Sequence, residues 1–173
     1  MRIALIHALR HSIAPTDAAF ARHWPEATLA TLLDDSLSAD LARDGRLTPA
    51  MSARFMTLAR YAADAGADGI LFTCSAFGPC IAACAAALPI PVLTPNQAML
   101  ADAARAGHVG LLATFGPTLV SMAPEFAPGQ RVTPVLAAGA LEALDAGDPG
   151  RHDALAAEAA LTIGDCDVIA LAQ

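Results

Sequence analysis

The sequence contains no lysine, and all ten of its basic residues are arginines. A lysine Schiff base, covalent attachment of pyridoxal phosphate and a P-loop lysine are therefore excluded within this chain. The formal net charge is −7 and no dense basic cluster interrupts it. Because phosphate contacts supply most of the affinity for nucleic acids, we expect no nucleic-acid partner. Any chemistry at a carbon atom must use groups other than an amine.

Several other signals are missing. No run approaches the roughly 20 apolar residues of a membrane-spanning helix, and no secretory signal opens the chain, so we expect a cytoplasmic protein without a membrane partner. No G-x-G-x-x-G follows the first predicted strand, which disfavours a flavodoxin-like or dinucleotide-binding domain. No C-x-x-C pair or zinc spacing occurs, so we expect neither a metal site nor a disulfide framework. The four cysteines are Cys74, Cys80, Cys84 and Cys166.

Apolar runs alternate with helical patterns along nearly the whole chain. Strands are predicted over 3–6, 28–33, 70–73, 91–94, 109–113, 132–136 and 168–172. Helices are expected over 17–23, 38–43, 48–65, 79–87, 97–106, 117–126 and 153–163, and Thr48 followed by Pro49 is the clearest start signal. This alternation predicts an α/β fold with mostly parallel sheets flanked by helices.

Small polar residues follow several of these strands. In parallel sheets the ligand lies beyond the carboxyl ends of the strands, which makes these positions candidates for a site. For any one of them, capping of the next helix is the simpler interpretation, but capping does not require a cysteine. The positions are His7, Asp35, Ser36, Thr73, Cys74, Ser75, Thr94, Pro95, Asn96, Thr114 and Gln173.

A faint internal repeat suggests two lobes. Residues 2–6 resemble residues 108–112, and residues 68–74 resemble residues 167–173. We therefore predict a first α/β lobe over 1–95 and a second over 96–173, with a substrate cleft between them. The repeat pairs Cys74 of the first lobe with Gln173 of the second.

Cys74 differs from an ordinary core cysteine in its position. It ends an apolar strand just before the helix that Pro79 opens. The free N–H groups and partial positive charge of a helix start favour thiolate over thiol, so we expect a lowered pKa and a reactive sulfur. The alternative is a small buried apolar residue, as we expect for Cys80 and Cys84.

The segment over 66–79, together with residues 91–95 and the Val-Gly-Leu-Leu-Ala-Thr stretch over 109–114, resembles the aspartate/glutamate racemase superfamily. That superfamily includes hydantoin racemases, maleate isomerases and arylmalonate decarboxylases. The resemblance implies two pseudo-symmetric lobes, a small carboxylate substrate between them and no cofactor. It also implies two cysteines, one per lobe, that act as acid and base on opposite faces of the α-carbon.

The resemblance carries over residue by residue with clear departures. Cys74 matches the first-lobe cysteine, Ser75 the position after it, and Thr114 the second-lobe hydroxyl. Ala76 stands where the family often has a hydroxyl, and Gln173 stands where the second cysteine is expected. Cys166 precedes the last strand and cannot replace it. The family continues past that strand with a further helix, a short strand and a closing helix, so we expect the chain to lack this segment.

We therefore expect a cofactor-independent, racemase-like enzyme that transfers a proton at the α-carbon of a small carboxylate, amino acid or related amide. Cys74 and Gln173 are the paired catalytic positions, and His7 or His11 is the candidate for a second proton-transfer group. Thr73, Ser75, Asn96 and Thr114 are expected to bind the substrate, and Asp35 and Ser36 its amino or amide group. The alternatives are a single-cysteine decarboxylase or isomerase of the same fold and a non-catalytic acid-binding module. Homo-oligomerisation is left open.

Overall fold

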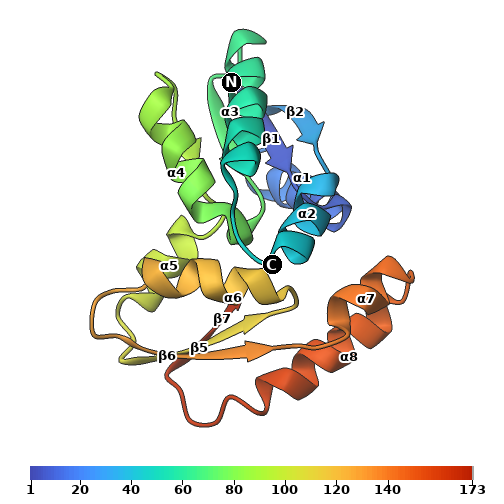
Figure 1. Cartoon of the computed structure of the whole chain (residues 1–173), viewed down its shortest axis with the longest axis vertical. Helices are drawn as coiled ribbons and strands as arrows, with labels where there is room; N and C mark the ends of the chain where they lie inside the picture. The colour runs from blue at the N-terminus through green and yellow to red at the C-terminus, as the bar shows by residue number, and fades with distance from the viewer. Residues whose placement is uncertain (173) are drawn as a thin grey trace. The chain divides into compact units, whose positions relative to one another are not determined.

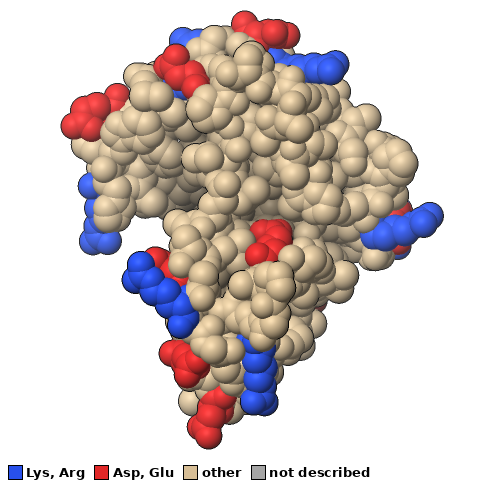
Figure 2. Space-filling view, turned by 90° about the vertical axis from the view of Figure 1, so that its left-hand side faces the viewer, with Lys and Arg blue, Asp and Glu red and all other residues tan. Residues whose placement is uncertain are grey.

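The computed structural model describes residues 1–172, which form two compact units that divide between Pro95 and Asn96. Within the described residues, no helix is both long and apolar enough to cross a bilayer. On the face shown in Figure 2 the arginines stand apart from one another, and most of the surface between them is uncharged.

The first unit is a four-stranded parallel sheet in the order β2-β1-β3-β4, flanked by helices (Figure 1). Its strands are β1 (Arg2–His7), β2 (Thr28–Leu33), β3 (Gly69–Phe72) and β4 (Val92–Leu93). Its helices are α1 (Ile13–His23), α2 (Ser36–Asp44), α3 (Pro49–Asp64) and α4 (Gly78–Ala87), with short 3-10 turns η1 (Arg10–Ser12) and η2 (Ser75–Phe77).

Helix α3 shows how the sequence builds this unit. The Thr48 hydroxyl accepts a hydrogen bond from the Met51 N–H at 3.3 Å, and Pro49 occupies the first turn, where no N–H is needed. The apolar face of the helix lies on the sheet, where the ring of Phe55 stacks on Phe72 with centroids 5.1 Å apart. Phe55 also contacts Phe77, so the core reaches the segment that carries Cys74.

The second unit is a three-stranded parallel sheet in the order β6-β5-β7. Its strands are β5 (His108–Ala113), β6 (Arg131–Leu136) and β7 (Val168–Ala172). Its helices are α5 (Gln97–Ala103), α6 (Gly116–Met122), α7 (Ala140–Asp145) and α8 (Pro149–Ala160), and the 3-10 turn η3 (Ala123–Glu125) follows α6. Helices α5 and α6 cover one face of the sheet, and α8 covers the other (Figure 1).

The two sheets share one strand arrangement, which supports the internal repeat. Strand β1 lies between β2 and β3 as β5 lies between β6 and β7. The Asp68 carboxylate accepts a hydrogen bond from the Arg2 N–H at 2.7 Å, and the Asp167 carboxylate accepts one from the His108 N–H at 2.8 Å. Aspartate therefore fixes the start of the central strand in both units.

The expected α/β architecture with parallel sheets is confirmed, but several helix ends differ. Helix α1 begins at Ile13 rather than near Asp17, because Pro15 falls in its first turn, where the missing N–H costs no hydrogen bond. Helix α7 was not predicted, because it spans only six residues between Gly139 and Gly147 and has no periodic apolar pattern of useful length.

Candidate functional site

Three strands of the first unit end side by side, and the chain stays hydrogen-bonded just beyond them. The Asp34 N–H donates to the His7 carbonyl at 3.0 Å, and the Thr73 N–H donates to the Ile6 carbonyl at 3.1 Å. The residues after β1, β2 and β3 are therefore held at one edge of the sheet. This edge brings together His7, Asp35, Ser36, Thr73, Cys74 and Ser75.

Cys74 lies at this edge with an extended backbone, and its side chain is buried. The sulfur is hydrogen-bonded to the backbone of Ala76 and to the side chain of Ser38. Burial nevertheless raises the pKa of the Cys74 thiol above its ordinary value. The expected lowering of this pKa is therefore wrong. Helix α4 begins four residues later, at Gly78, so the charge of its start acts too weakly on the sulfur to offset desolvation.

His7 is completely buried in a cluster of three hydrogen-bonding side chains. Its Nδ1 lies 2.9 Å from the Ser12 hydroxyl and 2.7 Å from the Thr73 hydroxyl, which are 3.1 Å apart. The Ser12 hydroxyl also donates to the Leu9 carbonyl. The Nε2 atom of His7 is buried and has no hydrogen-bond partner among the described residues. Burial lowers the pKa of His7, so the ring is a neutral acceptor or donor at physiological pH.

His7 and Cys74 share the sheet edge but not its face. Thr73 and Cys74 are consecutive extended residues, and side chains of consecutive extended residues point to opposite faces. Thr73 contacts His7 and Ser12, whereas Cys74 contacts Ser38 of α2. The structure therefore places His7 behind the strand that carries Cys74, as a neighbour of Thr73.

Asp35 and Ser36 lie at the end of β2, where each already has a partner. The Asp35 carboxylate is 2.6 Å from the Arg10 guanidinium, and both side chains are largely exposed. The Ser36 hydroxyl donates to Asp34 at 2.7 Å and accepts from Arg54. Both residues therefore belong to local ion-pair and hydrogen-bond networks at this edge.

Arg54 of α3 organises the larger of these networks. Its guanidinium donates to the Asp34 carboxylate at 2.6 Å and to Asp40 of α2 at 2.6 Å. Burial acts to raise the pKa of Asp34, but hydrogen bonds from Arg54 and Ser36 hold that pKa below its usual value. Arg54 therefore ties β2, α2 and α3 together beside the edge that carries Cys74.

In the second unit, Asn96 and Thr114 are both buried. Thr114 follows β5, the strand equivalent to β1. Asn96 precedes α5, and its amide donates to Glu125 at 3.5 Å. Burial raises the pKa of Glu125, and its Oε1 is buried without a hydrogen-bond partner among the described residues. Gln173, the predicted counterpart of Cys74, lies outside the described residues.

Four residues that shape these sites are not predicted by the sequence pattern. Ser12, Ser38, Arg54 and Glu125 follow no strand, so the rule that selects carboxyl ends of strands cannot find them. Ser38 and Arg54 each occupy a position in a helical pattern where a polar residue is usually solvated. Only their tertiary contacts reveal what they hold.

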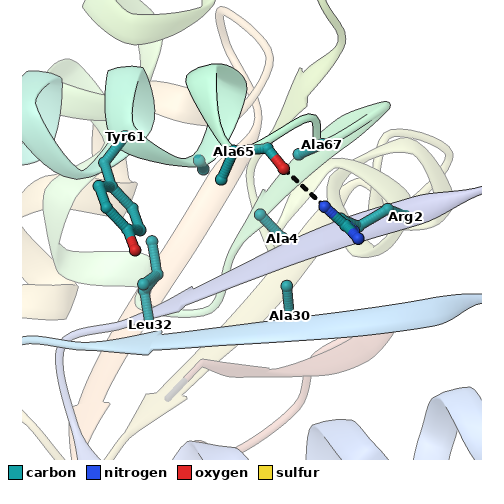
Figure 3. A pocket seen from close by; sticks show the side chains of 8 residues that line it. Arg2, Ala4, Ala30, Leu32, Tyr61, Ala65 and Ala67 are labelled. Carbon is teal, nitrogen blue, oxygen red and sulfur yellow. Dashed lines mark hydrogen bonds between the residues drawn. The ribbon is translucent and has the colours of Figure 1, made fainter.

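Two apolar hollows indent the first unit, and neither includes a predicted site residue. One, of about 80 Å³, lies between α3 and strands β1 and β2 and is lined mainly by alanines. Figure 3 shows the Arg2 guanidinium at its side, donating to the Ala65 carbonyl at 2.6 Å. The other, of about 180 Å³, lies on the opposite sheet face beside Phe20, Trp24 and Leu93.

Comparisons with known proteins place this geometry in context. The family model described as Asp/Glu/Hydantoin racemase matches residues 14–173. An allantoin racemase from Klebsiella pneumoniae has a similar structure, with a TM-score of 0.66 and 17% identity over 100% of this chain and 74% of that one. A candidate Asp/Glu racemase from Yersinia pestis gives a TM-score of 0.56 and 17% identity over 78% of this chain. The match spans 64% of the Yersinia protein, less than two thirds of its length. No curated protein sequence matches the chain. At this identity, both solved structures bear on the fold alone.

Proposed function

Because this chain belongs to the Asp/Glu/hydantoin racemase family, we propose that it is a cofactor-independent isomerase of small carboxylates, amino acids or related amides. In this proposal Cys74 carries the proton that is exchanged at the substrate's α-carbon. The observation that supports it most is the position of Cys74. A lone sulfur stands at the carboxyl edge of a parallel sheet, where α/β proteins bind their ligands, and two residues hold it in place.

The raised pKa of Cys74 determines which half of the reaction the resting thiol can perform. At neutral pH the sulfur holds its proton, so it is ready to protonate a carbanion from the face that it occupies. In that step the S–H bond breaks, a C–H bond forms and a thiolate remains. The reverse step removes the α-proton with the thiolate and restores the thiol. Ser75, which is buried beside Cys74, is our proposed donor to the substrate carboxylate.

Racemisation needs a second group that exchanges a proton on the opposite face of the carbon. Gln173 has no titratable group, and His7 contacts Ser12 and Thr73 on the sheet face away from Cys74. These observations favour a second candidate function, a decarboxylase or cis-trans isomerase of the same fold. A single thiol is sufficient there, because it protonates an enolate after carbon dioxide leaves or adds to an activated double bond.

The substrate classes to test follow from the family and from the structural neighbour. Aspartate, glutamate, hydantoins and allantoin each carry an acidic C–H beside a carbonyl group. We place the reaction in the cytoplasm, because all four cysteines are free and such thiols persist in a reducing compartment.

The proposal is tested by incubating the full chain in D2O with each enantiomer of these compounds. Loss of optical activity together with deuterium at the α-carbon identifies a racemase. Release of carbon dioxide from a malonate-type substrate, with one deuterium in the product, identifies the decarboxylase. Binding without turnover of any compound would contradict both and leave the acid-binding module. Cys74→Ala must abolish whichever reaction is found.

A further inference from the structure

Helix α6 carries a row of polar atoms that the fold leaves without partners. Thr118 Oγ1, Ser121 Oγ and Glu125 Oε1 are all buried, and each lacks a hydrogen-bond partner among the described residues. The three residues are spaced i, i+3 and i+7 in the sequence. Because η3 continues directly from α6, this spacing places their side chains along one helix face. We call these three residues the α6 row.

Hydroxyls elsewhere in this chain show that the α6 row is unusual. Thr16 of α1 and Thr57 of α3 each donate to the backbone carbonyl four residues earlier, at 2.6 and 2.9 Å. That bond satisfies a helical hydroxyl locally and is its ordinary partner. Thr118 is completely buried and makes no such bond. Its hydroxyl therefore lacks the local partner that the hydroxyls of Thr16 and Thr57 have.

Glu125 gives the row its chemical character. Its Oε2 is 3.5 Å from the Asn96 amide, a long and weak hydrogen bond, and its Oε1 has no partner within residues 1–172. A buried carboxyl oxygen without a donor costs free energy unless a ligand or water supplies one. Together the row presents two hydroxyl groups, which can accept as well as donate hydrogen bonds, and one carboxyl oxygen. Among the described residues, no group of three His, Cys, Asp or Glu side chains could hold a metal ion.

We propose that the α6 row binds the nitrogen-bearing end of a small ligand through N–H···O hydrogen bonds to Thr118, Ser121 and Glu125. An ammonium group and a neutral amide or ureide both offer several N–H donors from adjacent positions, which matches three acceptors along one helix face. A carboxylate or phosphate does not fit, since it would face the Glu125 carboxyl. The site lies within the second unit, and its test requires no reaction at Cys74.

The test uses the full chain labelled with [13Cδ]glutamate. The sequence has only four glutamates, and Glu26, Glu142 and Glu158 are exposed, so Glu125→Gln assigns the signal of interest. N-methylurea and methylammonium are titrated separately, with tetramethylammonium as the probe that lacks an N–H. We expect at least one N–H probe to shift the Glu125 resonance saturably while the other three stay in place. A response to N-methylurea indicates a neutral ligand, and a response to methylammonium indicates a cationic one.

Two variants make the result specific to the α6 row. Ser121→Ala should weaken probe binding about five-fold, the equivalent of one hydrogen bond. Thr57→Ala, which removes a locally bonded helical hydroxyl, should leave the affinity unchanged. A Glu125 signal that no N–H probe moves, an equal response to tetramethylammonium, or equal affinity in Ser121→Ala would overturn the proposal.

Discussion

Three equivalent positions at the sheet edges carry different types of residue in the two units. When the two sheets are matched by their strand registers, His7 is equivalent to Ala113, Asp34 to Ala137, and Thr73 to Ala172. The first unit places a polar group at each of these positions, and the second places alanine. The two units therefore share a backbone arrangement, while at these three positions only the first unit carries polar side chains.

This difference indicates that the two units are suited to different kinds of site. In the first unit most polar groups satisfy one another through Arg54 and through the cluster of His7, Ser12 and Thr73. These bonds fix the edge that carries Cys74 before any ligand arrives. In the second unit, Thr118, Ser121 and Glu125 on α6 and η3 each have a buried oxygen without a hydrogen-bond partner among the described residues. We interpret the first unit as a rigid support for chemistry and the second as a surface for recognition.

The largest effect on stability should come from substitution of Gly110, and Gly69, which also lies on a sheet strand, provides the control. A Cβ at Gly110 of β5 would lie 2.5 Å from Ile163 Cγ2, whereas one at Gly69 of β3 would meet its nearest atom at 3.6 Å. Gly110→Ala should therefore lower the free energy of unfolding by about 1–3 kcal/mol through overpacking. Gly69→Ala should change it far less. Urea unfolding followed by circular dichroism compares the two, and equal losses would show that the units are packed alike.

A pair of threonine substitutions compares the polar groups directly. Thr73→Val removes the three hydrogen bonds of the Thr73 hydroxyl, to His7, Ser12 and the Ile6 carbonyl, and should cost about 1–2 kcal/mol of unfolding free energy. Thr118→Val removes a hydroxyl that has no partner in the described part of the chain, and it should be neutral or stabilise the chain by about 1 kcal/mol. Thermal unfolding of both variants without ligand measures the signs. A comparable loss in Thr118→Val would mean that its hydroxyl is already satisfied.

A smaller effect should appear in the pH dependence of the first unit. The folded-state pKa of Asp34 lies below its unfolded value of about 3.9. Its carboxylate therefore adds stability above about pH 4, and that contribution is lost as pH falls through the folded pKa. Arg54→Gln should flatten the decline in stability between about pH 5 and pH 3. Fluorescence of Trp24, the single tryptophan, monitors unfolding of the first unit. If the unfolding free energy of Arg54→Gln depends on pH as steeply as that of the wild type, Arg54 does not stabilise the Asp34 carboxylate.

The backbone plan of both units could be predicted from the sequence, because apolar strands alternate with helices that begin at clear signals such as Thr48 and Pro49. The edge residues His7, Thr73 and Cys74 could also be predicted, since they lie at or just beyond the ends of strands. The partners that decide their behaviour were not. Ser12 and Ser38 come from other parts of the chain, and no local pattern distinguishes them from solvated residues.

Electrostatics was the part that local reasoning predicted least well. The position of Cys74 before a helix suggested an acidic thiol, but burial depends on the whole fold and it dominates. The same holds for Glu125, whose raised pKa comes from surroundings that the sequence does not reveal. Prediction succeeded where neighbours in sequence decide the outcome and failed where neighbours in space do.

The most direct measurement is the rate of α-proton exchange with D2O, compared between Cys74→Ser and Cys84→Ser on the same substrate. Both cysteines are buried in the first unit, and only Cys74 stands at the sheet edge. We expect Cys84→Ser to exchange at nearly the wild-type rate and Cys74→Ser to be slower by roughly 10²–10⁴-fold, the range for loss of a general acid or base. Exchange by folded Cys74→Ser at the wild-type rate would contradict the assignment of this sulfur to the reaction.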